Sequence, residues 1–204
     1  YIKRLATSTY RTQHRGGRGV QGMDTHEDDF VEHLLSTSTH DTLLFFTNKG
    51  KVYRLKGYEI PEFSRTAKGL PIVNLLQIDQ DEFVNTVISV RDQAEEREER
   101  YLFFTTKDGL TKRVHVSQFK NIRRSGLIAI RLREEDELIS VRLTTGTDDI
   151  GIATKQGYFI RFNEETVRPM GRNAAGVIGI RLREGDEVVS MEVIEKDAYI
   201  LHVT

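Results

Sequence analysis

The chain of 204 residues contains no cysteine, which excludes disulfides and thiolate metal sites and is typical of a cytoplasmic protein. It also lacks any apolar run close to the ~18 residues that a membrane-spanning helix needs, so no membrane contact is expected. Residues 1–5 lack the apolar segment of a signal peptide and read like the middle of a strand. We therefore expect the chain to be a piece of a longer cytoplasmic protein.

Neither sign of charge dominates, because 30 Lys and Arg residues balance 31 Asp and Glu residues to a net charge of -1. Hydrophobic residues make up 38% and charged residues 30%, as in ordinary globular domains. A balanced charge neither supports nor excludes a nucleic-acid partner. The distribution of charge along the chain is therefore the informative quantity.

A repeated pattern organises the chain. The segments 47–55, 106–114 and 154–162 all read Gly-x-x-x-Arg-apolar after a turn, and residues 1–5 fit the same pattern without its glycine. Self-similarity at a fixed period indicates a repeat architecture. A short apolar run precedes each glycine-containing turn, which predicts one β-hairpin per repeat.

Two further elements follow each hairpin. The first is a basic stretch that ends in a glycine, and the second is acidic and then apolar, as in residues 81–84. The longest interval between these glycines contains the charged run 91–100, which we expect to be a solvated loop insertion. The glycines, spaced by roughly 50 residues, are Gly19, Gly69, Gly126 and Gly176.

No stretch shows sustained helical periodicity, and about four short strands in each repeat favour propeller blades. We predict an all-β, propeller-like single domain over residues 1–204 with about four blades. A plain β-sandwich is the alternative, but it does not explain the repeat. The approximate repeats are 1–38, 39–92, 99–144 and 148–194, with 198–204 starting another.

Charges of opposite sign separate within each repeat. Residues 1–23 hold basic side chains and no acid, whereas residues 24–32 hold acids and no Lys or Arg. Equivalent positions of successive blades lie at one radius, so the basic clusters predict a curved positive band. The Asp-Glu turns are expected to lie elsewhere on each blade. Such a band suits a long polyanion that bends, and duplex DNA is the obvious candidate.

The predicted band would contact phosphates through Lys and Arg side chains and backbone N–H groups, with little base reading. Binding should then be nearly independent of sequence and strongly dependent on salt. An exposed Lys or Arg is usually only solubilising, but repetition in register favours a function. Besides the loop described next, the candidate contacts are Lys3, Arg4, Arg11, Lys49, Lys51, Arg54, Arg65, Lys68, Lys107, Lys112, Arg113, Arg123, Arg124, Lys155, Arg161 and Arg172.

Residues 13–19 give the sharpest local signal. They read Gln13-His14-Arg15-Gly16-Gly17-Arg18-Gly19, which is too rich in glycine for a packed strand and predicts a mobile loop that can approach phosphate closely. The segment resembles the seven-residue gyrase box of DNA gyrase A subunits, Gln-Arg-Arg-Gly-Gly-Arg-Gly. Its flanks, 1–5 and 19–23, and the later repeats resemble the same family. His14 stands where the family has Arg, which removes one permanent charge but keeps a hydrogen-bond donor.

The resemblance implies a β-pinwheel, a propeller variant in which neighbouring blades exchange strands. It also implies a non-catalytic domain around whose rim duplex DNA wraps, so that gyrase can introduce negative supercoils with ATP. By position, residues 13–19 inherit the role of the box. The implied partners are the remainder of the gyrase A protein and the gyrase B protein in an A2B2 complex, near the bacterial nucleoid. No cofactor is implied for this part, since ATP and Mg bind elsewhere in the parent complex.

Two alternatives stay open. The equivalent domain of topoisomerase IV would bind DNA similarly, but that group usually lacks an intact box. A propeller that binds a protein partner would show an exposed apolar or acidic patch in place of a positive rim. Catalytic readings are weak, because the sequence has no glycine-rich phosphate loop before a helix and its six histidines show no metal-ligand spacing.

Overall fold

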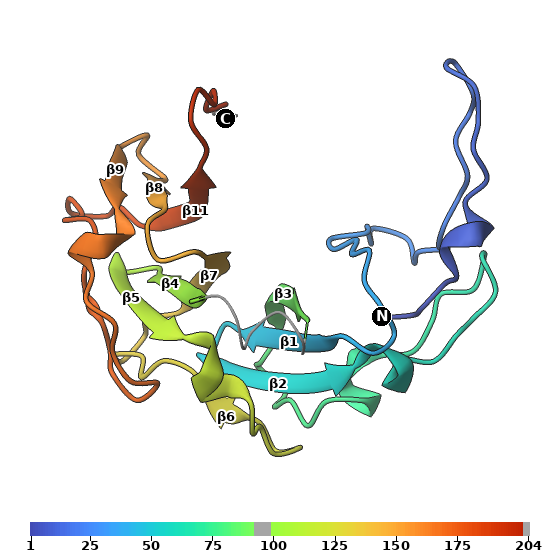
Figure 1. Ribbon diagram of the computed structural model, residues 1–204, viewed down its shortest axis with the longest axis horizontal. Helices are drawn as coiled ribbons and strands as arrows, with labels where there is room; N and C mark the ends of the chain where they lie inside the picture. The colour runs from blue at the N-terminus through green and yellow to red at the C-terminus, as the bar shows by residue number, and fades with distance from the viewer. Residues whose placement is uncertain (92–98, 202–204) are drawn as a thin grey trace.

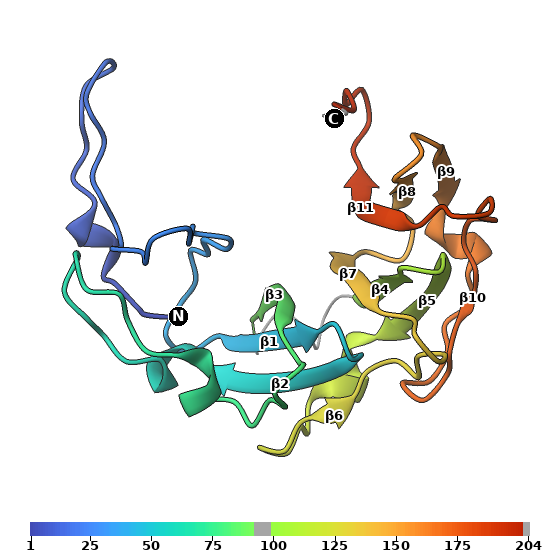
Figure 2. The same ribbon diagram turned by 180° about the vertical axis from the view of Figure 1, so that it is seen from behind.

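The computed structural model describes residues 1–91 and 99–201 as an all-β fold in which short 3-10 helices separate the strands, which confirms the predicted fold class. The two views show three sheets following one another along an open arc, with the blue N-terminal segment rising from one end as a long, narrow loop (Figures 1 and 2). We refer to residues 1–38, 39–92, 99–144 and 148–194 as units 1 to 4.

Each of units 2 to 4 contributes one hairpin and one returning strand. The central strand of the unit pairs antiparallel with both of these, as in the β1–β2 and β1–β3 ladders. The strands are β1 (Thr42–Thr47), β2 (Lys51–Lys56), β3 (Val84–Val90), β4 (Tyr101–Thr106), β5 (Leu110–His115), β6 (Leu127–Ile128), β7 (Leu138–Thr144), β8 (Asp149–Thr154), β9 (Phe159–Asn163), β10 (Val177–Ile178) and β11 (Val188–Ile194). The 3-10 helices are η1 (Thr7–Thr9), η2 (Gly57–Glu59), η3 (Ile72–Asn74), η4 (Val116–Phe119) and η5 (Glu164–Thr166).

Neighbouring units exchange a short strand. Strand β6 of unit 3 pairs with β2 of unit 2, and β10 of unit 4 pairs with β5 of unit 3. The sheet orders are therefore β3-β1-β2-β6, β10-β5-β4-β7 and β11-β8-β9. An isolated bridge between Ile2 and Leu70 repeats the exchange between units 1 and 2. This exchange is the feature that defines a pinwheel.

The core lies within the sheets and between successive units. All six residues of β1 are buried, so the strand reads as a continuous apolar run rather than an alternating one. At the boundary of units 2 and 3, the rings of Phe46 and Phe104 meet edge to face with centroids 5.6 Å apart, and Phe119 packs against both. Because units share this core, the loops at their edges hold fixed positions along the arc.

Two hairpin glycines allow the next unit to approach closely. Gly50 and Gly109 have positive φ angles of 73° and 81°. A Cβ atom at either position would lie 2.7 or 2.8 Å from a carbonyl oxygen of the following unit, that of Ile130 or Ile180. Only glycine fits both the turn and the contact between units.

Unit 1 differs from the repeat pattern, because it forms no strand of its own within the described residues. Residues 1–5 correspond to the second hairpin strand of the later units. Within the described residues, no strand lies beside residues 30–35. Four apolar side chains there are consequently exposed. They are Phe30, Val31, Leu34 and Leu35.

Two predicted segments fall partly outside the described residues. Most of the charged run 91–100 is residues 92–98, which lie outside them, as do residues 202–204 of the expected strand 198–204. Tyr199, Ile200 and Leu201 are exposed and outside any strand. None of the helices in residues 1–91 and 99–201 has the length and apolar character needed to cross a bilayer.

Candidate nucleic-acid interface

A tight turn recurs at equivalent places in the chain. In residues 14–17, 64–67 and 171–174, the last backbone N–H donates to the first carbonyl at 3.0, 3.1 and 3.1 Å. A turn of the same size in residues 123–126 closes directly on the repeat glycine, where the Gly126 N–H donates to the Arg123 carbonyl at 2.9 Å. We call residues 13–19, 64–69, 123–126 and 171–176 the basic turns. Each ends on a glycine with positive φ, namely Gly19, Gly69, Gly126 and Gly176.

The box-like segment 13–19 is the first of the basic turns. The Gln13 side chain closes it, because its Nε2 donates to the Gly19 carbonyl at 3.3 Å and its Oε1 accepts the Gly19 N–H at 3.1 Å. The Arg15 and Arg18 side chains are exposed and form no ion pair within the described part of the chain. The loop that we predicted to be mobile is thus closed by two hydrogen bonds between the Gln13 side chain and the Gly19 backbone. His14 and Arg11 are exposed beside it.

The basic turn of unit 2 lies beside unit 1. The Arg65 guanidinium donates to the Gln21 carbonyl at 2.7 Å, and the Lys68 ammonium is 3.1 Å from Nδ1 of His26. Both basic side chains remain exposed. These contacts place the basic turn of unit 2 next to the segment that follows the box.

The basic turns of units 3 and 4 are also tied to the preceding unit. Arg123 and Arg124 are exposed. Arg54 is half-buried, and its guanidinium donates to the Lys120 carbonyl at 2.9 Å. Arg54 therefore holds the segment that leads into the basic turn of unit 3. The Arg172 N–H donates to the side chain of Gln118 at 3.3 Å.

Two predicted contacts, Lys112 and Arg113, are wrong as surface groups. Their exposed fractions are 0% and 7%. Strand β5 lies between β10 and β4, so it is an interior strand of its sheet, and segment 169–174 of unit 4 covers Lys112 and Arg113. The Lys112 ammonium donates to the carbonyls of Gly171, Arg172 and Ala174. Burial, together with the nearby charge of Arg172, lowers the pKa of Lys112 to about 7.

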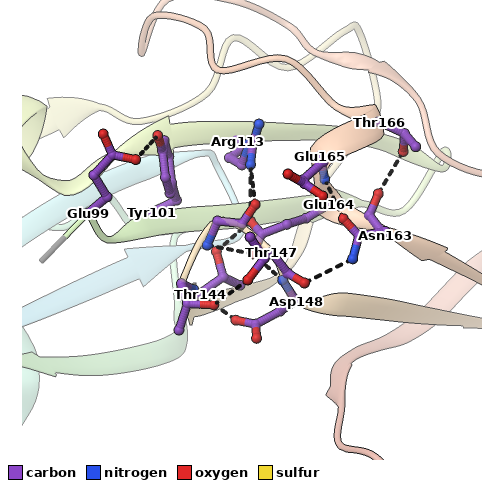
Figure 3. A network of polar contacts seen from close by, with 12 residues as sticks. Glu99, Tyr101, Arg113, Thr144, Thr147, Asp148, Asn163, Glu164, Glu165 and Thr166 are labelled. Atoms are coloured by element: carbon purple, nitrogen blue, oxygen red, sulfur yellow. Dashed lines mark hydrogen bonds and ion pairs between the residues drawn. The ribbon is translucent and has the colours of Figure 1, made fainter.

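Arg113 belongs to a buried polar network around Glu164 (Figure 3). Its guanidinium lies 3.8 Å from the Glu164 carboxylate and donates to the Gly146 carbonyl at 2.8 Å. Glu164 also accepts the Thr144 hydroxyl at 2.7 Å and the N–H groups of Gly146 and Asp148 at 2.8 and 2.9 Å. The network is structural, because a buried charge must be paired and hydrogen-bonded to be tolerated.

The hairpin lysines are neutralised by the acidic turns. Glu187 lies 3.4 Å from the Lys107 ammonium and 3.1 Å from that of Lys155, and these lysines lower the pKa of Glu187. Lys51 pairs with Asp79 at 2.7 Å and with Glu82 at 3.6 Å, and the bond to Asp79 raises the pKa of Lys51. These lysines are therefore not free to bind phosphate.

This pairing corrects our expectation that the Asp-Glu turns lie apart from the basic positions. Strand β11 runs antiparallel to β8 with Val188 opposite Thr154, so the acidic turn before β11 meets the hairpin turn after β8. Two predicted arginines are paired as well. Arg161 binds Asp149 at 2.6 Å and lowers the pKa of that carboxyl, and Arg4 lies 3.2 Å from Glu62.

Among the predicted contacts that lie in the hairpins of units 2 to 4, Lys49 alone is exposed without an ion pair in the described residues. Lys3 is half-buried, and its ammonium donates to the carbonyls of Ser64, Arg65 and Ala67 at 3.1, 2.7 and 2.7 Å. Burial lowers the pKa of Lys3. The basic side chains thus fall into two classes. One class is engaged in contacts between and within units, and the other lies at the basic turns, exposed in units 1 to 3 and half-buried at Arg172 in unit 4.

Four exposed arginines were missed by the sequence analysis. They lie in the repeated segments 130–133 and 180–183, which both read Ile-Arg-Leu-Arg and which directly follow the exchanged strands. The duplication itself was the signal that could have found them. Arg183 stacks over the Tyr158 ring at 4.3 Å. The four are Arg131, Arg133, Arg181 and Arg183.

The part of the chain that the structure describes contains no group of three His, Cys, Asp or Glu residues placed to hold a metal ion. What it presents instead is one basic turn per unit, with exposed Lys or Arg side chains in units 1 to 3 and the half-buried Arg172 in unit 4, set along a curved body by a shared core. That arrangement suits an extended anionic polymer better than a small ligand.

Comparison with known proteins supports this description. The family model for the DNA gyrase C-terminal domain, beta-propeller, matches residues 1–38, 41–91, 100–145 and 148–195. The DNA gyrase A subunit of Halalkalibacterium halodurans is 63% identical over 174 residues, which cover 85% of this chain and 20% of that protein. The Streptococcus pyogenes serotype M1 protein of the same name is 60% identical over 174 residues, 85% of this chain and 21% of its own length.

Solved structures of related domains have a similar fold. The C-terminal domain of a DNA topoisomerase IV aligns with a TM-score of 0.77 and 33% identity, covering 86% of this chain and 54% of that one. A DNA gyrase A C-terminal domain aligns with a TM-score of 0.71 and 30% identity, covering 94% of this chain and 60% of that one. The chain spans about a fifth of the curated relatives it matches. It belongs to the family of DNA gyrase A C-terminal domains.

Proposed function

We propose that this domain binds duplex DNA without sequence preference and bends it along the row of basic turns. The observation that carries the proposal is the sorting of the basic residues. Basic side chains without carboxylate partners recur at the basic turns, exposed in units 1 to 3 and half-buried at Arg172 in unit 4, whereas the hairpin lysines Lys51, Lys107 and Lys155 are held by acids. A long polyanion would therefore meet one basic turn per unit as it followed the arc.

The energetics favour a distributed contact. Smoothly bending a 20–30 bp site costs on the order of 1–6 kcal/mol. Each neutralised phosphate steepens the log–log salt dependence by about 0.9. Contacts from several basic turns can therefore offset the bending cost, while no single turn has to bind tightly.

In the parent enzyme, we propose, the wrapped DNA would allow ATP-dependent negative supercoiling by a bacterial gyrase. The partners would be the remainder of the gyrase A protein and the gyrase B protein in an A2B2 complex near the nucleoid in the cytoplasm. The cleavage and ATP sites would lie elsewhere in that complex. This domain would supply the path of the DNA, with segment 13–19 as its first contact.

The test is a linking-number assay. Relaxed plasmid is incubated with the chain and a type I topoisomerase at several salt concentrations, then deproteinised. We expect a shift in linking number that fades as salt rises and shrinks in Arg65→Ala/Lys68→Ala. The matched control Lys155→Ala/Arg161→Ala removes the same number of charges from ion-paired positions and should keep the shift. Absence of any DNA binding at low salt would contradict the proposal.

A second candidate is the role of a topoisomerase IV domain, which the TM-score of 0.77 to such a structure favours. Such a domain would bind DNA crossovers without wrapping. The same assay separates the two, because crossover binding without wrapping would bind the plasmid but leave its linking number unchanged. The glycine-rich turn 13–19, closed by Gln13, favours the gyrase role.

A further inference from the structure

Lys112 lies beneath the basic turn of unit 4 and is wholly buried. Its ammonium faces the carbonyls of Gly171 and Ala174 at 3.3 and 3.2 Å and also that of Arg172. The Phe104 ring packs against it at 5.3 Å, and no carboxylate in the described residues pairs with it. An ammonium has three N–H donors, so the turn satisfies all of them with backbone oxygens.

The same device occurs at the basic turn of unit 2. Lys3 donates to the carbonyls of Ser64, Arg65 and Ala67, which occupy the first, second and fourth positions of the turn. Those are the positions that Lys112 binds in the turn of unit 4. A lysine in one unit therefore braces the basic turn of the next unit in two places.

The brace fixes the direction of the peptide groups. In a trans peptide the N–H points opposite to the carbonyl of the preceding residue. With the carbonyls turned inward to lysine, several N–H groups of the turn point outward. Among the described residues, five of these N–H groups donate to no protein acceptor. They belong to Arg65, Thr66, Lys68, Asn173 and Ala175, and the last four occupy matching positions in the two turns.

We propose that each lysine-braced turn is a receptor for a DNA backbone phosphate, with Lys3 and Lys112 as positioning residues behind it. The outward N–H groups bind the phosphate oxygens, and the flanking Arg65 or Arg172 adds a guanidinium. The lysine touches no DNA. It orders the turn and places positive charge beneath it. The inference rests on the proposed DNA-binding function and names the phosphate sites within it.

Units 2 and 4 provide internal comparisons. At the position of Lys3 and Lys112, unit 2 has Tyr53, whose hydroxyl donates to Gln77 and Glu82, and unit 4 has Ile160. The Tyr53 ring lies under Gly126, where a Cβ atom would come within 2.7 Å of it. The basic turn 123–126 therefore lacks a lysine brace and is expected to bind through its side chains alone.

The experiment follows backbone amide resonances of the chain by NMR as a short non-specific DNA duplex is added. In the wild type, the amides of Asn173, Ala175, Thr66 and Lys68 should shift. Lys112→Met should abolish the shifts at 173 and 175 and keep those at 66 and 68, whereas Lys3→Met should do the reverse. Each variant should lose affinity by about tenfold, as for loss of a charged hydrogen bond.

Retention of the shifts at 173 and 175 in Lys112→Met would overturn the proposal, as would DNA binding by the wild type without shifts at the four amides. The second result would leave the proposed function standing, whereas no DNA binding would contradict that function itself. If Lys112→Met fails to fold, Lys3→Met and the wild-type spectra decide the matter. Lys155→Met, which changes an exposed lysine, is the matched control and should shift all four amides like the wild type.

Discussion

The Glu187 carboxylate of unit 4 lies 3.4 Å from the Lys107 ammonium of unit 3. The adjacent Val188 N–H donates to the Lys107 carbonyl at 2.9 Å, so side chain and backbone both join the two units. Acidic turns and hairpin lysines therefore form one interlocked row. Within this row the carboxylates neutralise the lysines, so the positive charge without a carboxylate partner lies at the basic turns.

The two basic classes should differ in the salt dependence of DNA binding. Arg123→Ala/Arg124→Ala removes two exposed side chains and should lower the log–log salt slope by roughly 0.9 for each phosphate that is no longer neutralised. Lys107→Ala/Lys155→Ala removes the same charge from paired positions and should change the slope little. Fluorescence anisotropy with a labelled duplex over a range of KCl concentrations measures both. Equal decreases in slope for the two variants would contradict the assignment.

Glu164 should be a major determinant of stability. Glu164→Ala leaves the buried Arg113 without its carboxylate and should cost about 3–5 kcal/mol of unfolding free energy. Glu165→Ala, at the exposed neighbour, should stay within about 0.5 kcal/mol of the wild type. Urea unfolding followed by circular dichroism gives both values. A loss below about 1 kcal/mol for Glu164→Ala would show that the network is not needed.

The hairpin glycines offer a matched pair. Gly109 and Gly157 have similar φ angles of 81° and 85°, but a Cβ atom at Gly109 would lie 2.8 Å from the Ile180 carbonyl, whereas none of the described atoms lies within 4 Å at Gly157. Gly157→Ala should cost only the left-handed backbone strain of about 1–2 kcal/mol. Gly109→Ala should cost clearly more, by thermal or urea unfolding. Equal costs would mean that the contact between units adapts freely.

DNA binding should depend on pH through Lys112. Burial lowers its pKa to about 7 in the free protein, where Arg172 is the charged group that faces it. A phosphate bound at the turn would stabilise the ammonium and raise this pKa, so binding takes up a proton. Affinity should then be full below about pH 7 and fall as pH rises through the higher pKa of the complex.

Anisotropy titrations at pH 6.5 to 9 measure this effect, and Lys112→Met should flatten the profile because nothing is left to titrate beneath that turn. A wild-type profile already flat over this range would contradict the prediction.

Local signals predicted much of the fold. Each repeat carries its own turn residues, such as Gly50, Gly109 and Gly157, and its own apolar run, so the hairpins could be predicted from short segments. The burial of Lys112 and Arg113 could not be. Strand alternation says which residues share a face, but only the strand arriving from unit 4 makes β5 an interior strand.

The distribution of charge could likewise be predicted only where it depends on short segments of sequence. The basic side chains before the repeat glycines are exposed in units 1 to 3, because their turn residues keep them at the surface. The neutralisation of Lys107 and Lys155 by Glu187 depends on strand pairing between residues about 30 or more positions apart. The order of charged residues along the chain does not predict that pairing.

Strand exchange also sets the order in which the protein can complete itself during synthesis. Synthesis of β1 and β2 is complete at Lys56, but the fourth strand of their sheet, β6, begins only at Leu127. At a synthesis rate of about 5–20 residues per second, the edge of β2 stays open for on the order of several seconds. An open edge is a template for pairing with another nascent chain. Each repeat thus depends on prompt translation of its successor, and a pause between the two would expose the growing chain to aggregation.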